Sequence, residues 1–189
     1  MTKNPKNQTM KKNVVAGLGE IGRPILKLLS KRNTTIGFDL NPDLMDQRKF
    51  ERYKDLETSF LHIAIPVTAK LINNILKLEK KFNPECIVIH STIKPGTTKK
   101  LQERLSIPVI YSATRGVHRR MIYDLKRYTK FFTISKNAPR SKWASLEFVR
   151  SMKKCGIKTR KMSKPETLEL AKIICDTSYL GWLVNYAQL

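Results

Sequence analysis

Cysteine is scarce in this sequence. The three cysteines are Cys86, Cys155 and Cys175, and no two of them form a CxxC pair. This scarcity excludes a disulfide scaffold and a cysteine-based zinc site, so we predict no metal and the reduced thiols typical of a cytoplasmic protein. No run of about 18 apolar residues is present that could span a membrane. The first twelve residues lack the apolar segment of a secretory signal, so no such leader is expected.

Acidic residues are also few. Asp and Glu total 15 against 37 Lys and Arg, which gives a formal net charge of +22 at pH 7. This surplus predicts attraction to polyanions such as nucleic acids, anionic membrane surfaces and phosphorylated small molecules. No helix-turn-helix, RNP or zinc-finger pattern accompanies the charge, so no motif supports nucleic-acid binding. A solvated basic surface explains the composition equally well.

The sequence does contain a regular alternation of strand-like and helix-like segments. Short apolar runs are separated by segments with apolar residues at helical spacing. The predicted strands are 13–18, 34–38, 60–65, 86–90, 108–111, 129–135 and 156–162. Continuous apolar strands with intervening helices are typical of a doubly wound, mainly parallel α/β sheet. We expect a flexible basic tail at 1–12, a sheet domain at 13–162 and a long C-terminal helix at 163–189.

A glycine-rich turn joins the first predicted strand to the first predicted helix. It fits the pattern GxGxxG and reads Gly17-Leu18-Gly19-Glu20-Ile21-Gly22. In this context the first glycine permits a tight turn, the second lets the backbone approach a pyrophosphate, and the third allows close helix–strand contact. The phosphates then lie at the positive N-terminal end of the helix. The motif therefore predicts a Rossmann-type dinucleotide-binding domain.

Asp39 follows the second predicted strand, 22 residues after Gly17. A carboxylate at this place accepts hydrogen bonds from an adenosine ribose and repels a 2′-phosphate, which favours NAD over NADP as the cofactor. Arg48, Lys49 and Arg52 lie nearby in the sequence and keep the choice open. The alternative interpretation is a glycine turn that only packs, with Asp39 capping a helix.

Two further segments follow the glycine turn. The first, 62–66, reads HIAIP and ends a predicted strand at a proline. The second, 88–98, reads VIHSTIKPGTT. Together with the turn and Asp39, these segments resemble the UDP-glucose/GDP-mannose dehydrogenase family. Members of that family use NAD to oxidise the alcohol of a nucleotide sugar to a carboxylate.

The resemblance implies roles for four residues of these segments. Ile65 and Pro66 would lie beside the cofactor, and Ser91 and Thr92 would lie near the nicotinamide and the reacting sugar. The alternative for 88–98 is a strand end followed by a helix that one of the two threonines of its PGTT run caps.

The final helix resembles the start of the family's long central helix, which carries a lysine and, four residues later, an asparagine that face the substrate. The matching segment begins at Pro165 and reads PETLELAK. Lys172 takes the position of the lysine, and Asp176 stands in place of the asparagine. A spacing of four puts both on one helix face, so a pair that faces the site and a solvated ion pair are equally compatible. Because the family dimerises through this helix, the resemblance also implies a homodimer.

Two parts of the family's oxidation machinery have no counterpart in the sequence. The family's catalytic cysteine lies in a Gly-rich segment, and none of the three cysteines has that context, so a thiohemiacetal route is not supported. Thr114 stands where the family has a glutamate. A basic cluster follows it at the sheet edge where ligands bind, formed by Arg115, His118, Arg119 and Arg120. His118 is a candidate general base or acid, and a basic exposed loop is the alternative.

The sequence thus predicts an NAD-binding protein that resembles a shortened nucleotide-sugar dehydrogenase and oxidises a sugar-nucleotide or phosphorylated alcohol. The related 6-phosphogluconate and 3-hydroxy acid dehydrogenases also place a lysine on the helix after such a domain, and they need no catalytic cysteine. The missing cysteine and glutamate favour a second hypothesis, an inactive NAD-binding module whose basic surface binds a polyanion or a protein partner. Direct binding of nucleic acid is a third hypothesis.

Overall fold

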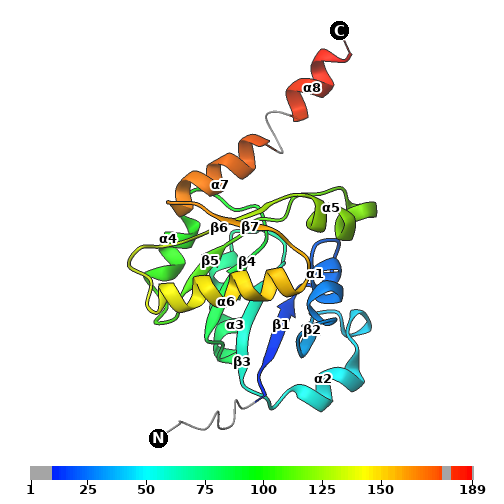
Figure 1. Ribbon diagram of the computed structural model, residues 1–189, viewed down its shortest axis with the longest axis vertical. Helices are drawn as coiled ribbons and strands as arrows, with labels where there is room; N and C mark the ends of the chain where they lie inside the picture. The colour runs from blue at the N-terminus through cyan, green and yellow to red at the C-terminus, as the bar shows by residue number, and fades with distance from the viewer. Residues whose placement is uncertain (1–9, 176–179, 189) are drawn as a thin grey trace, which may run out of the picture.

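The computed structural model describes residues 10–175 and 180–188. Within these residues seven strands form one sheet in the order β2-β1-β3-β4-β5-β6-β7 (Figure 1). The strands are β1 (Lys12–Ala16), β2 (Thr35–Phe38), β3 (Thr58–Ile63), β4 (Cys86–Ile89), β5 (Val109–Tyr111), β6 (Lys130–Ile134) and β7 (Thr159–Lys161). Neighbouring strands run parallel except β5 and β6, which pair antiparallel. This is the predicted doubly wound, mainly parallel α/β fold of the Rossmann type.

Helices cover both faces of the sheet. The helical elements are α1 (Gly22–Leu29), η1 (Pro42–Leu44), α2 (Gln47–Tyr53), α3 (Leu71–Phe82), α4 (Thr97–Gln102), η2 (His118–Arg120), α5 (Met121–Arg127), α6 (Ser141–Lys154), α7 (Pro165–Ile173) and α8 (Leu180–Tyr186). Val14 of β1 belongs to one buried apolar cluster with Ile75 of α3, and Val15 belongs to the other with Leu28 of α1. Successive side chains of a strand point to opposite faces, so a strand covered on both sides is apolar throughout, as β4 is.

Strand β1 begins one residue before the predicted start of the sheet domain. Lys12 is only 2% exposed, and its ammonium group donates hydrogen bonds to the carbonyl oxygens of Lys54 and Leu56. A lysine that finds backbone acceptors can be buried, which its residue type alone does not indicate. The predicted tail at 1–12 therefore includes one residue of the sheet, while residues 1–9 lie outside the described range.

Helix α7 is attached to the sheet domain through a buried carboxylate. Glu169 of α7 is fully buried, and its oxygens accept hydrogen bonds from Gly96 N (2.6 Å), Thr98 N (2.9 Å) and Thr98 Oγ1 (2.5 Å). These N–H groups belong to the first turn of α4, where backbone donors have no partner within the helix. Glu169 therefore caps α4. The alternative in which a threonine caps this helix is wrong, because Thr97 Oγ1 donates to Lys94 O instead (2.7 Å).

The C-terminal segment is helical in two described stretches. Helix α7 begins at Pro165, close to the predicted start of the final helix, and Figure 1 shows α8 beyond α7 on the side away from the sheet. Residues 176–179, between the two stretches, lie outside the described residues. In the described part of the chain, no helix is both long enough and apolar enough to cross a membrane.

Candidate functional site

The three glycines of the turn between β1 and α1 have different surroundings. Gly17 has φ = +88°, which glycine adopts without strain, and a Cβ on it would lie 2.5 Å from the carbonyl oxygen of Ala64. A Cβ on Gly22 would lie 1.7 Å from the carbonyl oxygen of Gly17, whereas one on Gly19 would meet no atom within 4 Å. Packing therefore requires Gly17 and Gly22, while Gly19 borders open space in which a phosphate group fits.

The carboxylate of Asp39 connects the end of β2 to this turn. Its Oδ2 atom accepts a hydrogen bond from Leu18 N (2.7 Å), and its Oδ1 atom accepts one from Asn41 N (2.9 Å). The next helical element, η1, is capped by Asn41, whose side chain accepts the N–H of Asp43 (3.1 Å). Asp39 is therefore not the cap of a helix, and the alternative interpretation that made it one is wrong.

The turn and Asp39 face a cleft of about 920 Å³ at the carboxyl ends of β1 to β4. The predicted cofactor residues in its lining are Gly17, Gly19, Glu20, Ile21, Asp39, Ile65, Pro66, Ser91 and Thr92. The remaining two, Leu18 and Gly22, are buried beneath the turn. The strand order reverses between β1 and β3, and ligands of open parallel sheets bind in the crevice at such a point.

Helix α3 supplies positive charge to the cleft. Lys77 and Lys81 line it, and Lys81 Nζ lies 4.1 Å from the centre of the Phe38 ring. Sequence reasoning missed both lysines, because they are indistinguishable in sequence from the solvated face of a helix. The basic residues of 48–52, which the sequence analysis considered for cofactor choice, are not part of the lining.

Ser91 and Thr92 have different surroundings at the end of β4. Ser91 is buried, and its hydroxyl donates to Ile65 O (2.7 Å), which joins the end of β4 to the end of β3. Thr92 is half-buried and lines the cleft. The hydroxyl of Thr92 is therefore the one placed to contact a ligand, and that of Ser91 holds the strand ends together.

The imidazole of His118 contacts the carboxylate of Glu20 at the rim of the cleft. Its Nδ1 atom lies 2.6 Å from Glu20 Oε2, and the two side chains are 59% and 67% exposed. The carboxylate contacts only Nδ1, so it orients the ring and leaves Nε2 available to a ligand in the cleft. The sequence singled out both residues, but for separate roles, and it did not predict their contact.

Two other histidines form a buried pair behind this edge of the sheet. His62 Nδ1 and His90 Nε2 are 2.9 Å apart, and His90 Nδ1 lies 3.1 Å from Ser112 O. Burial lowers the pKa of His62 to about 3 and also lowers the pKa of His90. Both rings are therefore neutral at pH 7, and they connect β3, β4 and the segment after β5.

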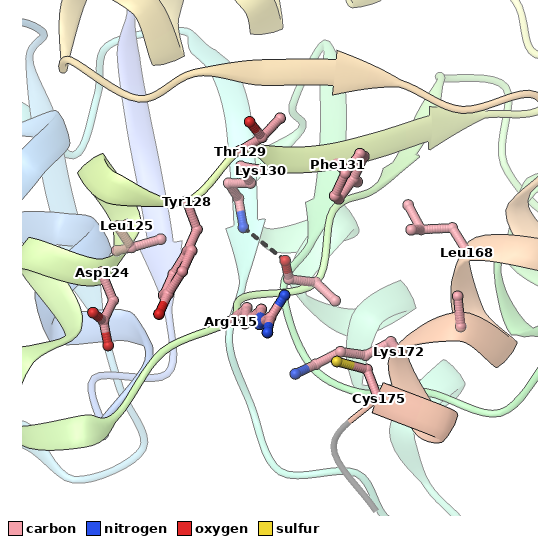
Figure 2. Close-up of a pocket in the computed structure, with 12 residues that line it drawn as sticks. Arg115, Asp124, Leu125, Tyr128, Thr129, Lys130, Phe131, Leu168, Lys172 and Cys175 are labelled. Atoms are coloured by element: carbon pink, nitrogen blue, oxygen red, sulfur yellow. Dashed lines mark hydrogen bonds between the residues drawn. The ribbon is translucent and has the colours of Figure 1, made fainter. Parts of the chain in front are cut away.

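A second cavity, of about 200 Å³, lies between the segment after β5, the start of β6 and helix α7 (Figure 2). Lys130 of β6 borders it. The buried ammonium group of Lys130 donates hydrogen bonds to Ser112 O (2.8 Å), Ala113 O (3.1 Å) and Thr114 Oγ1 (3.2 Å). Burial, with repulsion from Lys172, lowers the pKa of Lys130 to about 7. Sequence reasoning missed Lys130, for which a lone lysine at the start of an apolar run was the only signal.

The predicted catalytic residues do not all line one cavity. Thr92 and His118 line the cleft, whereas Lys172 lines the second cavity together with Arg115. Burial is the main cause of a lowered pKa at Lys172, and the charge of Arg115 lowers it further. Asp176 lies outside the described residues, so its pairing with Lys172 stays a prediction.

Among the residues that are described, no cluster of three or more His, Cys, Asp or Glu could hold a metal ion.

The chain is similar in fold to solved structures of dehydrogenases. UDP-D-ManNAc dehydrogenase from Pyrococcus horikoshii matches with a TM-score of 0.68 and 19% identity, over 86% of this chain and 49% of that one. UDP-glucose dehydrogenase from Pyrobaculum islandicum matches with a TM-score of 0.67 and 16% identity, over 92% and 51%. Prephenate dehydrogenase from A. aeolicus, solved in complex with hydroxyphenyl propionate and NAD+, matches with a TM-score of 0.65 and 14% identity, over 97% and 69%.

These similarities are structural. The sequence matches no protein-family model, and no curated protein sequence is significantly similar to it. The chain spans about half the length of the UDP-sugar dehydrogenases that it matches. The resemblance to UDP-sugar dehydrogenases inferred from the sequence is thus confirmed for the fold, which these proteins share with this chain.

Proposed function

We propose that this protein is an NAD-dependent oxidoreductase that oxidises an alcohol group of a nucleotide sugar or a phosphorylated alcohol. The observation that carries the proposal is the cleft in which the open side of Gly19 and the carboxylate of Asp39 come together. A phosphate group fits beside Gly19, and a ribose can donate its hydroxyl hydrogens to Asp39.

The residues of the cleft fit a dinucleotide. The glycine turn and the N-terminus of α1 offer N–H groups and a positive dipole end to the pyrophosphate. Asp39 accepts hydrogen bonds from Leu18 N and Asn41 N, which hold its carboxylate at the end of β2. A carboxylate there repels a 2′-phosphate, so we infer NAD rather than NADP.

NAD supplies a hydride acceptor when it is bound, and the chain must orient the alcohol and accept its proton. In this proposal Thr92 hydrogen-bonds the alcohol at the end of β4. Lys172 accepts the proton, because its lowered pKa leaves more of the neutral amine than an exposed lysine has. The imidazole of His118, oriented by Glu20 at 2.6 Å, is the second candidate for the base.

We infer a single two-electron oxidation, from the alcohol to the carbonyl. Thr114 occupies the position of the family's glutamate and hydrogen-bonds Lys130 (3.2 Å). Without a glutamate at this position, the residues of this chain give a second oxidation to a carboxylate no support.

Calorimetric titration with NAD and NADP tests the cofactor site. We expect the unmodified protein to bind NAD more tightly than NADP. Gly19→Val should abolish binding because its side chain fills the space for the phosphates, and Asp39→Asn should weaken binding of NAD more than that of NADP. Asp43→Asn, on an exposed residue outside the cleft lining, is the matched control. Failure of the unmodified protein to bind NAD would overturn the proposal.

An inactive NAD-binding module is the second candidate function, and Thr114 in place of the glutamate favours it. Incubation of the protein and NAD with nucleotide sugars and phosphorylated alcohols distinguishes the two. A dehydrogenase forms NADH with at least one compound and loses this activity in Lys172→Ala. A module binds NAD and forms NADH with none of them.

A further inference from the structure

The surface of helix α5 and of the segments on either side of it is basic. Residues 115–131 contain one acidic residue, Asp124. Its carboxylate is fully buried and accepts hydrogen bonds from Val117 N (2.9 Å) and Arg120 Nε (3.2 Å), so it organises the loop before α5. The charged side chains that this segment exposes are all positive, namely Arg115, Arg119, Arg120, Lys126 and Arg127. The surface around α5 therefore attracts anions.

Two tyrosines alternate with two of these arginines. Arg115 Cζ lies 5.1 Å from the centre of the Tyr128 ring, and Arg127 Cζ lies 5.4 Å from the same centre. Arg127 Cζ also lies 6.0 Å from the centre of the Tyr123 ring, and the Tyr123 side chain is 59% exposed. Figure 2 shows Arg115 and Tyr128 beside each other. The four side chains thus form one continuous surface, which we call the α5 patch.

The N–H donors of the two arginines are available to a ligand. A cation–π contact places the guanidinium group over a ring without using a hydrogen bond, and it restricts where the long side chain lies. Among the described residues, no carboxylate forms a salt bridge with Arg115 or Arg127. Arginine binds phosphate oxygens through two parallel N–H donors. The tyrosine rings therefore hold two phosphate-binding groups at the surface.

Positive charge continues from the α5 patch toward two neighbouring helices. Helix α5 contacts α1, and Figure 1 shows both on one side of the molecule. Burial raises the pKa of the Cys155 thiol, and the nearby charges of three exposed cations oppose that rise. These cations are Arg32 after α1, Lys126 of α5 and Lys154 of α6. Cations from three parts of the chain thus lie close together next to the α5 patch.

We propose that the α5 patch binds a single-stranded nucleic acid. An unpaired base stacks on the exposed ring of Tyr123, while Arg115 and Arg127 bind phosphate groups of the backbone. The cations beside the patch then meet the phosphates that follow along the strand. An anionic membrane matches the charge, but its headgroups offer no flat ring to stack on the tyrosines. The proposal does not depend on the dehydrogenase function, since no residue of the α5 patch lines the cleft.

Fluorescence anisotropy tests the patch with the full chain and two labelled strands, an oligodeoxythymidylate and an oligouridylate, each of about 20 nucleotides. We expect saturable binding of at least one strand, with an affinity that falls as the salt concentration rises. Tyr123→Ala should weaken this binding about tenfold, because a stacked base is lost. The slope of log affinity against log salt should stay unchanged in this variant, since stacking releases no counterions.

Substitutions of Arg127 test the phosphate contact separately. Arg127→Gln should weaken the binding and reduce the salt slope by about 0.7, the value for one phosphate contact of a single strand. Arg127→Lys keeps the charge and should keep the slope. Arg52→Gln is the matched control, because Arg52 is exposed on α2 and lies over the ring of Tyr53 (5.1 Å). Figure 1 shows α2 far from α5, so this variant should bind as the unmodified protein does.

Four results would overturn the proposal. Neither strand binds saturably, or Tyr123→Ala binds as tightly as the unmodified protein. Equal weakening by Arg127→Gln and Arg52→Gln would show attraction by the net charge alone. Tighter binding to vesicles of phosphatidylserine and phosphatidylcholine than to either strand would assign the patch to a membrane surface. A protein that binds a strand but does not bind NAD would retain the α5 patch and reject the dehydrogenase.

Discussion

The ammonium group of Lys130 is buried in the protein interior. Its three hydrogen bonds, to Ser112 O, Ala113 O and Thr114 Oγ1, satisfy all three donors of an ammonium group. Burial and the charge of Lys172 oppose that ammonium and lower its pKa to about 7. The stability of the protein should therefore depend on pH through this residue.

Between pH 7 and 10.5 the unfolded chain keeps Lys130 protonated, whereas the folded chain releases the proton. The unfolded state then binds more protons, so the free energy of unfolding should rise with pH across this window, by up to about 1.4 kcal/mol per pH unit. Urea unfolding of the unmodified protein and of Lys130→Met at several pH values measures the difference in slope. Lys126→Met, at an exposed lysine, is the control. Parallel curves for the unmodified protein and Lys130→Met would contradict the prediction.

The sequence predicts the role of a residue where that role depends on the local conformation of the backbone. The glycine turn was predictable because a Cβ on Gly17 or Gly22 would overlap neighbouring backbone, and because Gly19 leaves open the space where a phosphate group fits. Lys130 was not predictable, because its burial depends on carbonyl groups that only the folded chain places around it. The contact between His118 and Glu20 depends in the same way on tertiary structure.

At the scale of elements, hydrogen bonds to one carboxylate of α7 connect helix α7 to the start of helix α4. Helix α4 has Gly96 as its N-cap residue and no side-chain cap from its own segment, and Glu169 from α7 supplies one. The same segment follows Thr92, and α7 carries Lys172. One buried carboxylate thus joins the segment that follows Thr92 to the helix that carries Lys172.

Replacing Glu169 with glutamine should destabilise the protein by about 2 kcal/mol. The glutamine amide keeps one acceptor oxygen, and its NH2 group then faces backbone donors, so hydrogen bonds to a charged group are lost. Urea unfolding measures the effect. Glu166→Gln on the same helix is the matched control, and we expect a change within about 0.5 kcal/mol for it. Equal stability of the two variants would contradict the capping role of Glu169.

For the whole molecule, alternating strands and helices were enough to predict the sheet and its mainly parallel order. The antiparallel pairing of β5 and β6 was not predictable in detail, because α5 between them is short and irregular segments flank it. The net charge of +22 indicated anionic ligands but no location for them. That Arg115, Lys130 and Lys172 border one cavity depends on the tertiary fold and could not be predicted from the sequence.

Exposed apolar residues on α8 support the predicted homodimer. Trp182 and Tyr186 are 65% and 68% exposed, and their rings stack with centroids 6.2 Å apart. Val184 on the same helix is also 56% exposed. Large aromatic side chains are costly to leave in water and are enriched at protein interfaces, so we expect α8 to pack against a second copy of the chain.

Light scattering over a range of protein concentrations tests this arrangement. Trp182→Ser should weaken the dimer by about 2 kcal/mol or more, which raises its dissociation constant about thirtyfold. Tyr123→Ser removes a 59% exposed aromatic side chain from α5 and should leave the dimer intact. A monomeric unmodified protein, or equal weakening by the two variants, would contradict an interface at α8. An intact dimer in Trp182→Ser would place the interface on another surface of the molecule.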